Sequence, residues 1–107
     1  MPIPNTRTAA TTPLKTRGSY RASKQDLLLR FNRLNGQITG ISQMVEDERY
    51  CPEVLTQLSA AIAALEKIGY MLLRDHVKHC VADGINAGEG DAYLDELVAT
   101  IKRFSGR

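Results

Sequence analysis

Two series of apolar residues at helical spacing constrain this chain more than any other feature of its sequence. Members of the first series are separated alternately by four and three residues, and they are Leu27, Phe31, Leu34, Ile38, Ile41 and Val45. The second series follows one helix face and comprises Leu55, Leu58, Ile62, Leu65, Leu72 and then His76. Such spacing lays a continuous apolar stripe along a helix and suits it to pack against another helix. Since no alternating strand pattern competes with these series, the sequence predicts an all-α fold.

We expect two long helices and one short helix. Ser19 or Ser23 is a suitable cap for the first helix, because a serine side chain accepts hydrogen bonds from N–H groups at a helix start. Pro52 suits the first turn of the second helix and places Cys51 near its cap. The Gly and Asn residues between 83 and 90 are expected to terminate this helix. The short third helix carries Leu94, Leu97, Val98, Ile101 and Phe104.

The second helix is apolar over more than one face. Four further apolar residues widen its surface, and they are Val54, Ala61, Ile68 and Val77. This surface exceeds what a single antiparallel neighbour needs, so two neighbours are implied and we expect an oligomer.

The 107 residues form one domain at most. Charge is distributed unevenly along them. Residues 1–24 contain five basic and no acidic residues, whereas residues 25–107 contain nine basic and twelve acidic ones. The first 18 residues are rich in Pro, Thr and Ala, which predicts a disordered basic arm over 1–18 and a helical domain over 19–107. Such an arm favours contact with a polyanion such as nucleic acid, although a merely solvated tail has the same composition.

No apolar stretch approaches the roughly 20 residues needed to span a bilayer, and the N-terminus lacks the apolar segment of a secretory signal. We therefore expect a cytoplasmic protein with no membrane partner, whose two cysteines are reduced thiols. The sequence shows no nucleophile–base–orienter set, so we do not expect an enzyme.

Cys51, His76 and Cys80 are candidate metal ligands. His76 and Cys80 are four residues apart and share a helix face, whereas Cys51 lies roughly 38 Å from His76 along a continuous helix. Metal–ligand bonds are only about 2.0–2.3 Å long, so the three residues meet only between two antiparallel copies of the helix. Thiolate and imidazole ligands suit Cu(I) or Zn(II). The alternative is that Cys51 is a small apolar residue at a helix start and His76 a polar residue at a helix end.

Several segments, in this order, resemble the CsoR/RcnR family of bacterial transcriptional repressors. They are Arg33-Leu34-Asn35-Gly36-Gln37-Ile38-Thr39-Gly40-Ile41, Tyr50-Cys51, residues 54–60 and His76-Val77-Lys78-His79-Cys80-Val81. The resemblance covers about residues 23–104. It implies a three-helix protomer whose long second helices pair antiparallel in a dimer, two such dimers in a tetramer, and operator DNA as a partner.

Resemblance to the copper(I) sensors of this family implies a site made by Cys51 of one subunit with His76 and Cys80 of the other. Tyr50 and Glu96 match positions that support these ligands in the copper sensors. Cu(I) is then the inducer, and its binding releases the operator. A persulfide, redox or formaldehyde sensor of the same fold, using Cys51 with or without Cys80, is the alternative, and a purely structural oligomerisation module is another. His76 favours a metal, because sulfur chemistry does not need it.

Basic residues of the arm and of the helices are the expected phosphate contacts. They are Arg17, Arg21, Lys24, Arg30, Arg33, Lys67 and Arg74. Such contacts supply affinity more than sequence specificity. Asn32 and Thr39 stand where many relatives have Arg, so the helical body is less basic than is usual in the family.

Overall fold

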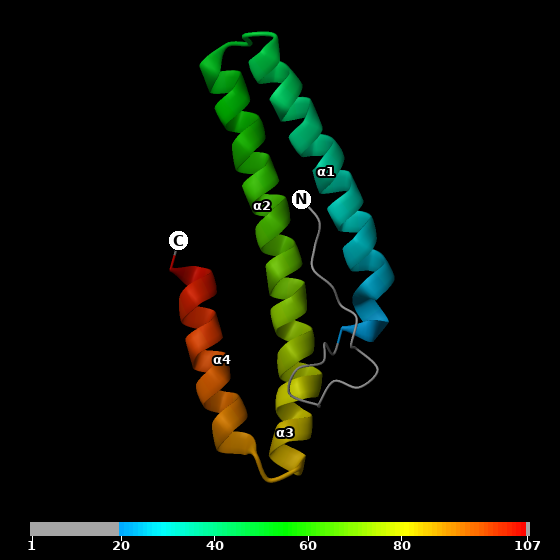
Figure 1. Ribbon diagram of the computed structural model, residues 1–107, viewed down its shortest axis with the longest axis vertical. Helices are drawn as coiled ribbons and strands as arrows, with labels where there is room; N and C mark the ends of the chain where they lie inside the picture. Colours follow the sequence, from blue (N-terminus) through cyan, green and yellow to red (C-terminus); the bar gives the residue numbers. More distant parts are fainter. Residues whose placement is uncertain (1–19, 107) are drawn as a thin grey trace. The chain divides into compact units, whose positions relative to one another are not determined.

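The structure is a computed structural model that describes residues 20–106, and its described part is helical apart from short turns (Figure 1). A 3₁₀ turn, η3 (Arg21–Ser23), leads into α1 (Lys24–Glu46). Then follow α2 (Cys51–Asp75), the π-helical segment η4 (His76–Val81) and α3 (Ala82–Asn86) without intervening residues, and finally α4 (Gly90–Ser105). The described residues contain no strand, and their two long helical segments and one short helix confirm the all-α prediction. No described helix is long and apolar enough to span a membrane.

Ser23, one of the two serines predicted to cap the first helix, does not cap it with its side chain. Ser23 immediately precedes α1, but its backbone is nearly helical (φ −98°, ψ −1°) and its side chain makes no capping hydrogen bond. Ser19 and the predicted basic arm over 1–18 lie outside the described residues. Helix α1 therefore continues from the 3₁₀ turn rather than from a side-chain cap.

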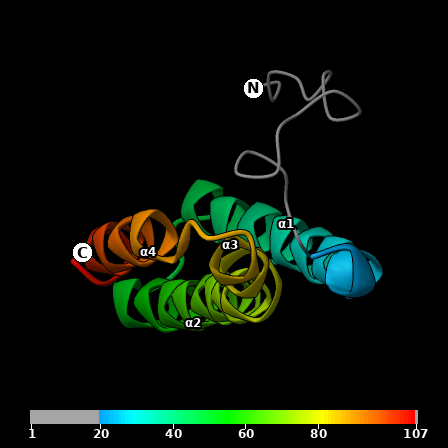
Figure 2. The same ribbon diagram turned by 90° about the horizontal axis from the view of Figure 1, so that it is seen from below.

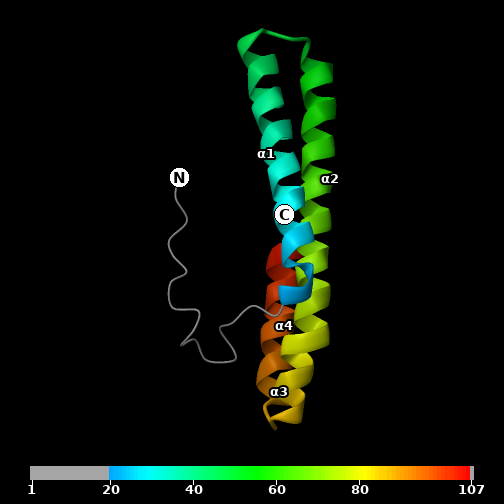
Figure 3. The ribbon, with the colours of Figure 1, turned by 90° about the vertical axis from the view of Figure 1, so that its right-hand side faces the viewer.

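The described chain divides into two compact units, residues 21–73 and a unit containing residues 74–106. In the first unit α1 and α2 form an antiparallel hairpin and lie side by side (Figure 3). Its core consists of Leu27, Leu34 and Ile41 from α1 with Ala61 and Ile68 from α2, all at most 8% exposed. Each helix thus contributes residues seven apart, which is the spacing that keeps side chains on one seam.

The first apolar series of α2 is not the face that packs on α1, which agrees with the expectation that this helix has more than one neighbour. Leu55, Leu58, Ile62 and Leu65, which we call the outer stripe, are 41–61% exposed. Helical periodicity separates them by about a quarter turn from Ala61 and Ile68, so one neighbouring helix covers one set and leaves the other. Phe31, Ile38 and Val45 of α1 are exposed as well.

In the second unit α4 packs on η4 and α3, and a short turn joins α3 to α4 (Figure 2). The buried cluster there consists of Cys80, Val81 and Tyr93, with Leu97 partly buried against it. Three of the apolar residues that the short helix carries are exposed, namely Leu94, Val98 and Ile101. They lie beside Tyr93 on the wheel of α4, and the face centred on Tyr93 is the one that η4 and α3 cover.

Two helix ends are closed by the same hydrogen-bond pattern. After α1, Glu48 donates to the Val45 carbonyl (3.0 Å) and Arg49 to that of Met44 (2.9 Å). After α3, Gly88 donates to Ile85 (3.1 Å) and Glu89 to Gly84 (2.7 Å). Both are Schellman motifs, which require a left-handed residue after the cap. Gly88 (φ 82°) supplies it without strain, whereas Glu48 (φ 56°) adopts it with a side chain.

Replacing Glu48 by glycine should therefore stabilise the fold. We expect Glu48→Gly to raise the free energy of unfolding by about 0.5–1 kcal/mol, since relief of the left-handed strain outweighs the added freedom of the unfolded chain. Gly88→Ala is the matched control. A Cβ at Gly88 would meet no atom within 4 Å, so only backbone strain acts, and stability should fall by about 1 kcal/mol. Urea unfolding at fixed protein concentration measures both, and a Glu48→Gly variant that is less stable would contradict the assignment.

Candidate metal centre and basic surface

Cys51 opens α2 and faces solvent. Its side chain is exposed, and the preceding Tyr50 is 71% exposed. The Tyr50 carbonyl accepts hydrogen bonds from the N–H groups of Glu53 (3.0 Å) and Val54 (3.3 Å). Tyr50 is therefore the residue that caps α2, and Cys51 rather than Pro52 is the first helical residue.

His76 and Cys80 lie in a π-helical segment, not in the α-helix that their spacing predicted. Segment η4 begins at His76 and ends at Val81, one residue after Cys80. A π-turn encloses one more residue than an α-turn and is frequent at functional sites. His76 is half-buried and Cys80 is 4% exposed, while His79 is exposed as expected for a surface residue.

No complete ligand set forms within one chain. Cys51 is the first residue of α2 and His76 follows its last, and a helix of 25 residues is about 37 Å long at 1.5 Å per residue. In residues 20–106 no group of three or more His, Cys, Asp or Glu side chains lies close enough to hold a metal ion. The proposed ligands thus lie at opposite ends of α2, with His76 and Cys80 together at one of them.

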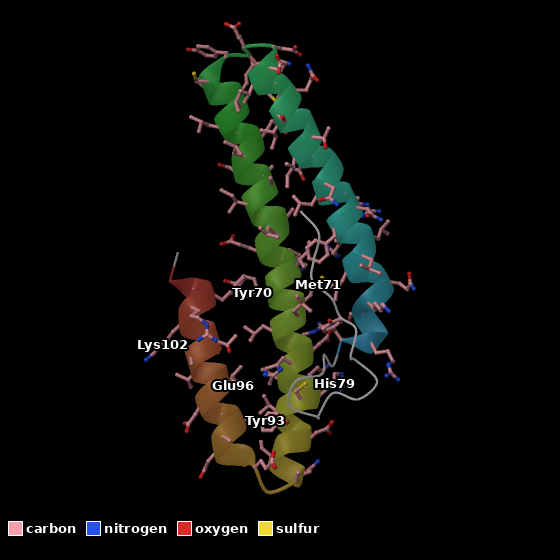
Figure 4. The ribbon with its side chains drawn as sticks, viewed as in Figure 1. Tyr70, Met71, His79, Tyr93, Glu96 and Lys102 are labelled. Atoms are coloured by element: carbon pink, nitrogen blue, oxygen red, sulfur yellow. The ribbon has the colours of Figure 1, made fainter. Side chains whose placement is uncertain are left out.

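Tyr93 is the most deeply buried side chain near the candidate ligands. It is 1% exposed and lies in one buried cluster with Cys80 and Val81. Figure 4 shows it projecting from α4 toward η4 and α3, with Glu96 one turn further along α4. Burial raises the pKa of the Tyr93 phenol above its ordinary value of 10.0, and the negative charges of nearby groups raise it further. In order of effect these groups are Glu89, Cys80, Glu96 and Asp83.

Sequence reasoning missed two buried residues of this region. Tyr93 was passed over because the apolar count of the third helix began at Leu94, although Tyr93 is spaced four residues from Leu97. Asp75 is 6% exposed, and it is the one charged residue among the described residues that is buried. It follows Ile68 by seven residues, so the heptad spacing of the α2 core would have placed it on the buried face.

The raised pKa of Tyr93 predicts a loss of stability at alkaline pH. The neutral phenol is the form that the fold favours, so its contribution is fully present below pH 10 and is lost as the pH rises through the pKa of the folded state. In a phenolate absorbance titration, one of the four tyrosines should ionise after the others, and Tyr93→Phe should remove that late component. Simultaneous ionisation of all four tyrosines in the folded protein would show the burial of Tyr93 to be wrong.

Three of the predicted basic residues share one side of the α1–α2 hairpin. Arg30 precedes the last residue of α1 by 16 positions and Lys67 follows the first residue of α2 by 16, so the antiparallel hairpin places them at one level. Given the buried seam, helical periodicity directs Arg30, Arg33 and Lys67 to the side opposite the outer stripe. Arg30 also pairs with Asp26 (3.2 Å), an exposed pair of the kind worth only about 0.3–0.5 kcal/mol. A phosphate can readily replace that partner.

The other predicted basic residues are more dispersed. Arg21 lies in η3, Lys24 begins α1 and Arg74 lies in the last turn of α2, and all three are exposed. Arg17 lies outside the described residues.

Comparison with known proteins decides the family. Residues 23–103 match the model of a family described as metal-sensitive transcriptional repressors. The chain belongs to this family. That membership agrees with the resemblance seen in the sequence and with the expectation that the protein is not an enzyme.

Two relatives within the family are named as copper-sensing repressors. The chain is 43% identical over 89 residues to the copper-sensing transcriptional repressor CsoR of Bacillus subtilis (strain 168), covering 81% of this chain and 88% of the relative. It is 38% identical over 87 residues to the copper-sensing repressor RicR of Mycobacterium tuberculosis (strain ATCC 25618 / H37Rv), covering 79% and 91%.

Two solved structures share the fold. The copper-sensing repressor CsoR with Cu(I) from Geobacillus thermodenitrificans NG80-2 superposes with a TM-score of 0.75 at 38% identity, covering 96% of this chain and 93% of that one. The nickel-responsive regulator InrS superposes with a TM-score of 0.67 at 36% identity, covering 75% and 90%. The fold is therefore compatible with sensors of either metal, and the metal must be argued from the ligands of this chain.

Proposed function

We propose that this protein is a copper(I)-responsive transcriptional repressor whose metal-free form binds operator DNA and whose Cu(I) form releases it. The proposed site joins Cys51 of one subunit to His76 and Cys80 of another. The observation that carries the proposal is the outer stripe of α2, because its register connects the two ends of that helix in an antiparallel pair.

The register argument uses only the spacing of exposed residues. Gly69 and Leu72, both half-buried, continue the outer stripe at the same helical spacing. If Cys51 of one copy lies opposite His76 of the other, each remaining stripe position meets another stripe position. The resulting pairs are Leu55 with Leu72, Leu58 with Gly69, and Ile62 with Leu65. In the layer of Leu58 and Gly69, a bulky side chain thus faces a small residue. The same register pairs the apolar stripe with itself and brings the candidate ligands of the two copies together.

The donor set favours Cu(I). Two thiolates and one imidazole are soft ligands that suit Cu(I) as a closed trigonal set, whereas structural Zn(II) prefers four ligands. Cys51 is an exposed free thiol, and Cys80 is a buried cysteine. The copper-sensing names of the relatives and the Cu(I)-bound neighbour support the same metal.

We assign subunit pairing to one side of the hairpin and DNA contact to the other. The outer stripe lies on one side together with Phe31 and Ile38 of α1, where these residues suit pairing into a dimer and, beyond it, a dimer of dimers. Arg30, Arg33 and Lys67 lie on the other side, where phosphates have access to them. Arg17, Arg21, Lys24 and Arg74 complete the proposed DNA contacts, and Arg17 belongs to the basic arm.

Release requires that Cu(I) bind the DNA-free conformation more tightly than the DNA-bound one. We propose that Tyr50 and Glu96 support the ligands, Glu96 by accepting a hydrogen bond from the ring nitrogen of His76 that does not bind the metal. Glu96 is half-buried on α4 beside Tyr93. Metal binding at η4 would thereby be transmitted to α4.

Mixing two variants tests whether the site lies between subunits. Cys51→Ser and Cys80→Ser chains should each bind Cu(I) weakly as homodimers. When the two are unfolded and refolded together at equal amounts, half of the dimers are mixed, and each mixed dimer has one complete site. About a quarter of the wild-type number of tight sites should therefore return, measured by competition with a Cu(I) chelator. A mixture that binds no more tightly than its components would contradict the intersubunit site.

An operator-release titration tests the function itself. Under anaerobic reducing conditions, stoichiometric Cu(I) should release a labelled operator fragment, whereas Zn(II), Ni(II), formaldehyde and polysulfide at the same level should not. Glu96→Ala is the control for coupling, and it should retain most of the Cu(I) affinity while losing release. Release by nickel alone would reassign the metal, and release by polysulfide or formaldehyde would favour a thiol-based sensor.

A further inference from the structure

In the second unit Cys80 shares a buried cluster with the aromatic ring of Tyr93. Tyr93 and Cys80 belong to one buried cluster, and they are 1% and 4% exposed. Gly84, one helical turn after Cys80, provides the surface on which the ring lies. A Cβ atom built on Gly84 would come within 2.2–2.6 Å of three carbon atoms of the Tyr93 ring. The ring therefore rests directly on the backbone of α3, and any side chain at position 84 would displace it.

The other cysteine has no such cover. Cys51 is exposed at the start of α2, so the two proposed thiol ligands differ in access within the chain. A buried thiol reacts with a dissolved electrophile only in the fraction of molecules that are locally open. A metal ion differs, because bonds to Cys51 and His76 form together with the bond to Cys80 and offset the free energy of opening.

We propose that Tyr93 is a selectivity-determining residue that restricts access to the Cys80 sulfur, so that the site accepts a metal ion and resists electrophiles. The inference rests on the proposed function for the role of Cys80 as a ligand. It is distinct from the support assigned to Tyr50 and Glu96, because it concerns steric cover and not a hydrogen bond. The shape of the ring, and not its hydroxyl group, carries this role.

Alkylation of Cys80 tests the proposal without copper or DNA, so its failure is separable from failure of the proposed function. The probe is iodoacetamide and the chain is Cys51→Ser, which leaves Cys80 as the one thiol. In the reaction the thiolate displaces iodide, a C–S bond replaces the C–I bond, and the thiol proton passes to the buffer. Mass spectrometry follows the rate in the folded protein and in the same chain unfolded in urea.

Folded Cys80 should react at least tenfold more slowly than unfolded Cys80, and adding Tyr93→Ala should raise the folded rate by about tenfold. Tyr93→Phe keeps the ring and should leave the rate unchanged. Leu97→Ala shortens a neighbouring side chain of the same cluster, and it controls for general loosening of α4. The proposal is overturned if Tyr93→Ala leaves the rate unchanged, or if Tyr93→Phe or Leu97→Ala raises it equally.

If Tyr93→Ala loses the circular dichroism signal of its helices, two further variants test the proposal in its place. Tyr93→Leu keeps an apolar side chain of smaller size, and Gly84→Ala displaces the intact ring from the backbone of α3. Both should accelerate alkylation of folded Cys80. Unchanged rates in both would overturn the proposal.

Discussion

The packing of α1 against α2 along residues seven apart is the interaction on which the other features of the protein depend. Leu27, Leu34 and Ile41 cover Ala61 and Ile68, and this contact fixes the rotation of each helix about its axis. Once that rotation is set, the outer stripe points to one side of the hairpin and Arg30, Arg33 and Lys67 point to the other. A small chain buries a modest fraction of its surface, and here large aliphatic side chains of α2 stay exposed. The proposed dimer is the arrangement that removes them from water.

The candidate metal centre depends on a second local feature, the π-helical segment at the end of α2. It begins at His76 and ends one residue after Cys80, and the Tyr93 ring of α4 lies against Gly84 of α3, the helix that follows it directly. Ligand residues, a non-α backbone and a fitted aromatic ring therefore coincide in one stretch. A change in the backbone of η4 on metal binding would also move α3, which follows it directly. Helix α4 would move with α3, because the Tyr93 ring lies directly against Gly84. This physical link underlies both the proposed coupling through Glu96 and the cover over Cys80.

The sequence was sufficient to predict the helices, and it was insufficient to predict which faces of those helices are buried. Apolar spacing predicted three helical segments, and their ends fell close to where Pro52 and the Gly-rich segment suggested. Apolar spacing left open which of two sets of α2, the outer stripe or Ala61 and Ile68, packs on α1. Both sets have helical spacing, and the side chains of the outer stripe are the larger ones. Ala61 lies in the core because a small residue lets two helices approach closely, which hydrophobicity alone does not reveal.

Sequence by itself determined the all-α class, the separation of Cys51 from His76 and Cys80, and hence that these three candidate ligands do not meet within a single chain. These follow from periodicity and from the rise of a helix, which are local properties of the chain. Only the tertiary structure decided which apolar face is buried, that His76–Cys80 is π-helical, and that Tyr93 shares a buried cluster with Cys80. Those features depend on contacts between residues distant along the chain, above all the fit of the Tyr93 ring on Gly84, which a local pattern does not encode.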